Sequence, residues 1–270
     1  MNYNFTYILI LILLFRYGSI TDGFDYITPS GPSIQIKSTV RDLGILFDNK
    51  LMFHHHIAKT VAKANQMAGW TLRVFKSRST LVLRTLLKTL VIPHLEYGCV
   101  IWSPTDVRHI NMLENVQRRF TSRFSCFQEY SDALQTTICS HDYVQRLKKL
   151  KLYSMQRRRE RYIILYMVKI IYELVPNPGF VYSYNDRTLL KVTPKSASRG
   201  PSWVKKAIEA SFFRQGPLLF NKLPRNMRDF HNTPTPDSKT LARFKSKLDR
   251  HLATIADHPG NAHNSLLTAQ

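Results

Sequence analysis

The stretch Val40–Ile57, with the sequence VRDLGILFDNKLMFHHHI, marks the change from strands to helices in this chain. Its first half is rich in branched and aliphatic residues, which favours a strand, and Asp48-Asn49 is a turn signal. Upstream, residues 26–36 (YITPSGPSIQI) place Pro-Ser-Gly-Pro between two short runs, which predicts another turn between strands. We therefore expect a small β-hairpin with an added strand, ending where the histidines begin.

The three histidines, His54 to His56, are adjacent in the sequence. On a helix, neighbouring side chains point about 100° apart, so the three cannot converge on one ion. The chain also lacks the HExxH motif that places two histidines on one helix face. We expect no metal site here, and we interpret the histidines as the start of a helix whose first side chains face water.

Downstream of the histidines, apolar residues recur every three or four positions, which is typical of amphipathic helices. The first such stripe is Ile57, Val61, Ala64, Ala68, Leu72 and Phe75. Further helices are expected from Ser79 as an N-cap, after Pro104 with Thr105 as the cap, from about residue 141, over about 152–174, over 203–220 in part, and over 238–255. The sequence thus predicts a mainly α fold, with a small β-hairpin, a helical bundle and a mixed α/β C-terminal region. The expected segments are 1–25, 26–53, 54–175 and 176–270.

The charge of the chain is strongly positive. Lys and Arg number 39 against 18 Asp and Glu, a formal net charge of +21. Such a surface attracts polyanions, of which nucleic acid and anionic lipid are the commonest, and the clustering of the charge favours nucleic acid. The three cysteines are widely spaced and include no CxxC pair, which favours reduced thiols in the nucleus or cytoplasm over a zinc site or a disulfide framework.

An apolar run near the start, Thr6–Phe15 (TYILILILLF), leaves a second location open. It is shorter than the roughly 18 residues that a membrane-spanning helix needs, and no basic residue precedes it. A signal or anchor would place the chain in the secretory pathway or at a membrane. The alternatives are a buried strand, or a leader foreign to the rest of the chain. We expect membrane contact only through this run.

Basic residues cluster in two places. The segment 146–161 (RLKKLKLYSMQRRRER) holds eight Lys or Arg and one acid, Glu160, and the helix before it adds further arginines. A basic helix face can follow a phosphate backbone, and the interleaved Tyr153 and Tyr162 could stack on bases or sugars. Solvated helix surface and a nuclear-import signal are the alternatives. The expected nucleic-acid-binding residues are Arg118, Arg119, Arg123, Lys148, Lys149, Lys151, Arg157, Arg158 and Arg161.

Motifs for catalysis are missing from the sequence. It contains no GxxxxGK[ST], GxGxxG or GxSxG pattern, and no two adjacent carboxylates. Nucleotidyl transfer by two metal ions needs clustered carboxylates, whereas Asp42, Asp48 and Glu96 are isolated. We expect no catalytic residues, no cofactor and no small-molecule substrate.

Several blocks, in order, resemble one family. The segment VRDLGILFDNKLMFHHHI with KANQMAGWTLRVF, then LLKTLVIPHLEYGCVIWSP, INMLENVQRRFT, RLKKLKLYSMQRRRERYIILYMVKII and SFFRQGPLLFNKLP are similar to the region downstream of the catalytic core in non-LTR retrotransposon (LINE) reverse transcriptases of the jockey-like and chicken-repeat-like groups. The resemblance covers about residues 26–270.

The resemblance implies a palm-hairpin remnant in 26–53, then thumb and post-thumb regions. The family's Asp-Asp motif, which holds magnesium in the intact enzyme, is absent from this chain. The resemblance therefore implies a truncated RNA-directed DNA polymerase that binds RNA or an RNA–DNA duplex without polymerising by itself. Three alternatives stay open: a polymerase component that is active only with the missing domains, a decayed element without function, and a membrane-tethered basic protein.

Overall fold

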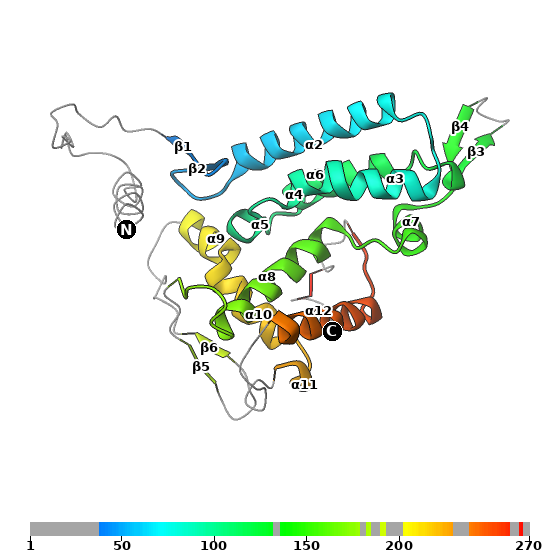
Figure 1. Ribbon diagram of the computed structural model, residues 1–270. Coiled ribbons are helices and arrows are strands. Elements are labelled where there is room, and N and C mark those ends of the chain that lie inside the picture. Colours follow the sequence, from blue (N-terminus) through cyan, green and yellow to red (C-terminus); the bar gives the residue numbers. More distant parts are fainter. Residues whose placement is uncertain are drawn as a thin grey trace. The chain divides into compact units, whose positions relative to one another are not determined.

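The structure is a computed structural model that describes residues 38–131, 136–178, 182–184, 190–192, 202–228, 238–259 and 265–266 (Figure 1). The expectations for the apolar run 6–15 and the turn in 26–36 lie outside these residues. The chain divides into two compact units, residues 1–56 and 57–270, and each is described by itself.

The first unit contains the antiparallel hairpin β1 (Thr39–Asp42) and β2 (Ile45–Asp48), in which Thr39 pairs with Asp48. Leu43 and Gly44 form the turn, with φ of 44° and 87°. Two residues with positive φ match the right-handed twist of a two-residue hairpin, and Gly44 adopts that backbone without strain. The expectation of one strand over 40–47 was therefore wrong, because the chain reverses within it.

The Asp48 side chain organises the end of the hairpin. Its carboxylate accepts hydrogen bonds from the backbone N–H groups of Lys50 (3.0 Å), Met52 (3.1 Å) and Phe53 (2.6 Å). His56 is buried, and its Nδ1 accepts the N–H of Leu46 at 3.3 Å. His54 and His55 are exposed at the start of helix α2 (His54–Val74), which confirms the expected helix entry.

The second unit begins with the body of α2 and a series of helices. They are α3 (Thr80–Leu86), the π-helical turn η1 (Leu87–Val91), α4 (Ile92–Glu96), α5 (Cys99–Trp102) and α6 (Val107–Thr121). Ser79 caps α3 as expected, since its hydroxyl accepts the N–H of Val82. Pro93 lies in the first turn of α4, where it needs no hydrogen-bond donor, so the chain stays helical across it. The cap of α6 is Asp106, one residue later than expected.

A short connection links α6 to the next pair of helices. It contains η2 (Ser125–Phe127) and the hairpin of β3 (Gln128–Ser131) and β4 (Thr136–Cys139), which no pattern in the sequence predicted. Then follow α7 (Tyr143–Leu150), capped by Asp142, and α8 (Met155–Ile171). Arg146 of α7 is buried and donates to the backbone carbonyl of Arg118 (3.1 Å) and to Thr121 Oγ1 (3.3 Å), which fastens α7 to the end of α6.

Helix α8 is central to the second unit, because most of its side chains are buried. It packs against α5, α6, α10 (Phe212–Asn221) and α12 (Ser238–Thr254). The remaining elements are the hairpin β5 (Tyr182–Tyr184) with β6 (Leu190–Val192), α9 (Ser202–Ala210) and α11 (Arg225–Arg228). The fold is mainly helical with small antiparallel hairpins, as the sequence predicted. In the described part of the chain, none of the helices is both long and apolar enough to cross a membrane.

Candidate nucleic-acid interface

The nine predicted binding residues lie in two different environments. Six of them belong to α6, α7 and the residues that directly follow these helices, and three belong to α8. The exposed members of the first group are Arg119, Arg123, Lys148, Lys149 and Lys151, which we call the α6–α7 basic surface.

Two contacts shape the α6–α7 basic surface. Arg118 is half-buried, with its guanidinium 4.9 Å above the ring of Tyr143, and it donates to Asn115 Oδ1 at 2.5 Å. Lys149 Nζ lies 2.5 Å from His141 Nε2. The neighbouring acid, Asp142, accepts the N–H of Gln145 at 2.7 Å as the cap of α7. This arrangement leaves Arg119, Arg123, Lys148 and Lys151 without an ion pair to any described residue.

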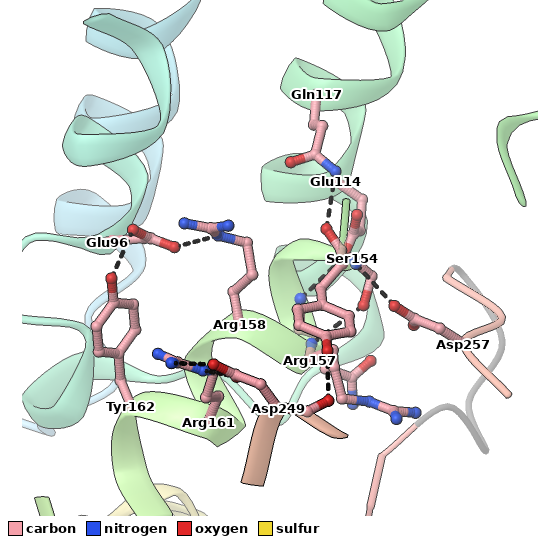
Figure 2. A network of polar contacts seen from close by, with 12 residues as sticks. Glu96, Glu114, Gln117, Ser154, Arg157, Arg158, Arg161, Tyr162, Asp249 and Asp257 are labelled. Carbon is pink, nitrogen blue, oxygen red and sulfur yellow. Dashed lines mark hydrogen bonds and ion pairs between the residues drawn. The ribbon is translucent and has the colours of Figure 1, made fainter. Parts of the chain in front are cut away.

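The three arginines of α8 are engaged inside the protein (Figure 2). Arg157 is fully buried, and it donates to the backbone carbonyls of Ala256 (2.9 Å) and Ile255 (3.5 Å). Arg158 forms an ion pair with Glu96. Arg161 donates from Nε (2.5 Å) and Nη2 (2.9 Å) to the two carboxylate oxygens of Asp249 on α12. The expected phosphate-binding face of α8 is therefore occupied by internal partners.

The two tyrosines that were expected to stack on bases also have internal partners. Tyr162 donates its hydroxyl to Glu96 at 3.1 Å, and Tyr153 donates to the carbonyl of Asp249 at 3.0 Å. Burial raises the pKa of both phenols above the ordinary value. Nothing in the segment 146–161 signals these contacts, because Glu96 and Asp249 lie far away in the sequence.

A buried polar network surrounds the start of α8. Glu114 accepts the N–H of Gln156 (2.9 Å) and the hydroxyl of Tyr143 (2.8 Å). Glu160 accepts hydrogen bonds from the hydroxyl of Ser265 (2.6 Å) and from the backbone N–H of Leu266 (3.1 Å). Burial raises the pKa of both carboxyl groups, because the charged form loses its hydration.

Arg159 is the positive member of this network. It is 1% exposed, and none of its guanidinium nitrogens has a hydrogen-bond partner in the described part of the chain. Burial lowers its pKa, which the nearby carboxylate of Glu114 opposes. The network fastens α6, α8 and the residues after α12 to one another, so its role is structural.

No cluster that could hold a metal ion occurs among the described residues. Asp42 and Asp48 belong to the first unit, where the Asp48 carboxylate accepts backbone hydrogen bonds after the hairpin. Glu96 is occupied by Arg158 and Tyr162.

Comparisons with known proteins give one relative. No family model matches the chain, and no solved structure matches it. An uncharacterized protein of Caenorhabditis elegans is 26% identical over 231 residues, which cover 84% of this chain and the whole of that protein. The likeness shows that a chain similar to nearly all of this one exists in that nematode.

Proposed function

We propose that this chain binds the phosphate backbone of RNA or of an RNA–DNA duplex through the α6–α7 basic surface. The observation that carries the proposal is the set of five exposed cations there, none of which forms an ion pair with a described residue, although Lys149 contacts His141. The net charge of +21 supports it, because the excess charge raises the local concentration of polyanions.

We also propose that the chain descends from a reverse transcriptase and does not polymerise nucleotides by itself. The resemblance to non-LTR retrotransposon reverse transcriptases supports a descent from the thumb and post-thumb regions of such an enzyme. The absence of an adjacent carboxylate pair from the sequence supports binding without independent polymerisation. Magnesium is the cofactor of the intact family enzymes, and we propose no magnesium ligands in this chain.

The binding residues of the proposal differ from those expected from the sequence alone. Arg119, Arg123, Lys148, Lys149 and Lys151 are kept, and Arg118 has a supporting role on the ring of Tyr143. Arg157, Arg158 and Arg161 are left out, because their guanidinium groups already have partners.

The test is a titration of labelled RNA and of an RNA–DNA duplex with the full chain between 50 and 200 mM salt, followed by fluorescence anisotropy. Changing the five exposed cations of the α6–α7 basic surface to Gln should reduce the slope of log K against log salt by about 3 to 4 for single strands and 4 to 5 for a duplex. The matched control changes five exposed cations on other helices or connections to Gln, namely Lys59, Lys76, Lys205, Lys206 and Arg214.

The proposal requires the α6–α7 variant to lose far more of its salt dependence than the control. Equal losses in both variants would mean that net charge alone attracts the nucleic acid, and would overturn the proposed surface. A primer-extension assay with the purified chain should give no incorporation, and incorporation would favour the polymerase alternative.

A further inference from the structure

Helix α12 places four of its five Lys and Arg residues on a face away from its apolar residues, and the fifth, Lys245, lies beside the apolar face. Leu241, Phe244, Leu248 and Leu252 are at most 9% exposed and lie in the core. Four exposed cations follow at spacings of four, four and three: Lys239, Arg243, Lys247 and Arg250. At 100° per residue these four lie within about 80° of one another, and the centre of their group is about 150° from that of the apolar group. We call them the α12 stripe.

The charge of the stripe is not neutralised by acids of the same helix. The single acid of α12 is Asp249, which lies off the stripe and accepts two hydrogen bonds from Arg161. Among the described residues, the four stripe cations form no ion pair. Arg250 Nε makes only a 3.4 Å hydrogen bond to the carbonyl of Ser246 in its own helix. The positive potential along this face is therefore free to attract an anion.

A hollow lies beside the stripe. Its lining comes from α11, α12 and the residue before α11, and the two helices contact each other (Figure 1). The volume of the hollow is about 320 Å³, and Pro224, Asn226, Met227, Lys247, Arg250 and His251 line it. Cavities of this size begin to accommodate small ligands, and a phosphate with its sugar is smaller than most. The surface of the hollow is mostly apolar, and its lining residues include Lys247, Arg250 and Asn226, whose side chains carry groups that can donate to phosphate oxygens.

Another cation lies close to the hollow. Arg225 is exposed on α11, between the lining residues Pro224 and Asn226. Its positive charge adds to the attraction of Lys247 and Arg250 for an anion.

The form of the helix argues against a membrane as the partner. A basic amphipathic helix binds a lipid surface by inserting its apolar face, but the apolar face of α12 is already buried in the protein. None of the large apolar side chains of α12 is exposed among the described residues. A partner that offers a row of charges, without requiring apolar insertion, fits this face better.

We propose that the α12 stripe is a second contact surface for the nucleic-acid backbone, with the hollow beside it seating one phosphate. The stripe is about 16 Å long, and a duplex presents about nine or ten phosphates over that length, so four cations can each reach one. This inference rests on the proposed function, because it assumes that the chain binds nucleic acid at all.

The test compares the full chain with K239Q/R243Q/K247Q/R250Q, using a labelled 25-base-pair duplex between 50 and 200 mM salt. The slope of log K against log salt should fall by about 3 to 4, as four phosphate contacts are lost. The matched control removes four exposed cations elsewhere, K59Q/K76Q/K205Q/R214Q, and should lose much less. Equal urea midpoints of the variants show that all of them are folded.

The outcomes separate this inference from the proposed function. If the unaltered chain shows no salt-dependent binding, the proposed function fails and the inference fails with it. If the α6–α7 variant loses binding while the α12 variant matches the control, the α12 stripe is overturned and the proposed function stands. If the α12 variant loses attachment to vesicles containing phosphatidylserine but keeps nucleic-acid binding, the stripe is a lipid contact and the inference is wrong.

The phosphate seat has its own readout. On addition of the duplex, the ring proton resonances of His251 should shift in the unaltered chain and should not shift in the K247Q/R250Q variant. Unchanged His251 resonances in the unaltered chain, at duplex concentrations that saturate binding, would exclude the hollow as the seat.

Discussion

Arg161 on α8 and Asp249 on α12 form a two-point ion pair, with Nε and Nη2 at 2.5 and 2.9 Å from the two carboxylate oxygens. The pair uses a cation that the sequence suggested for phosphate binding, and it holds the last long helix against the central one. Hydrogen bonding to Asp249 raises the pKa of Arg161, which favours the charged guanidinium in this pair.

A double-mutant cycle with Arg161→Ala and Asp249→Ala should therefore give a favourable coupling. Both side chains keep some exposure, 21% and 42%, so we expect about 0.5 to 1 kcal/mol, falling as salt rises. Urea unfolding of the four proteins measures the coupling. Additive effects of the two substitutions would show that the pair contributes nothing to stability.

Replacement of Arg157 by Ala should be far more damaging than replacement of an exposed arginine. The side chain is fully buried, and its loss leaves a hole and the carbonyls of Ile255 and Ala256 without their donor. We expect a loss of about 2 to 4 kcal/mol in the free energy of unfolding. Arg119→Ala is the control and should change it by less than about 0.5 kcal/mol.

The buried carboxyl of Glu114 should make stability depend on pH. Burial raises its pKa in the folded protein, so the folded state holds this proton more tightly than the unfolded chain does. The free energy of unfolding should then fall as pH rises from about 4.3, the value for an unperturbed Glu, up to the raised folded pKa. In Glu114→Gln this fall should be smaller, as urea titrations at several pH values would show. The exposed Glu129→Gln should retain the full dependence, and an unchanged profile in Glu114→Gln would contradict the assignment.

The cysteines should differ in reactivity. Cys99 is buried, and burial raises the pKa of its thiol to about 12, whereas Cys126 is exposed. Because the thiolate is the reactive form, iodoacetamide at pH 8 should modify Cys126 in the folded protein and Cys99 only after unfolding. Mass spectrometry of peptides taken over time gives the order. Equal rates at both sites in the folded protein would mean that α5 is not packed as described.

Substitution of Asp48 by Ala should loosen the end of the hairpin. The carboxylate accepts hydrogen bonds from three backbone N–H groups, and the methyl group of Ala cannot accept them. We expect faster hydrogen exchange at the amides of Met52 and Phe53, by about tenfold or more, since each loses a hydrogen bond worth about 1.5 kcal/mol or more to a charged acceptor. Asp142→Ala, which removes the cap of α7 instead, should leave these two amides unchanged.

The amino-acid sequence by itself determined most of the helices. The stripes through Ala64 in α2, Val116 in α6 and Leu248 in α12 mark faces that are buried in the structure. This works because residues three or four apart share a helix face, so the signal is complete within a short segment. The hairpin within 39–48 escaped prediction because its turn residues, Leu43-Gly44, are not one of the Asn-Gly or Asp-Gly pairs that signal a two-residue turn.

Only the tertiary structure decided which basic residues remain free to bind a partner. In the sequence, Arg157, Arg158 and Arg161 resemble Lys148, Lys149 and Lys151, and all belong to one basic run. In the fold, the arginines meet carboxylates of α4 and α12 and carbonyls of the residues that follow α12, whereas the lysines are exposed. The sequence shows where each charged side chain lies along the chain, but not what it contacts. The partners of Arg158 and Arg157 lie 62 and 99 residues away, and only packing brings them within hydrogen-bonding distance.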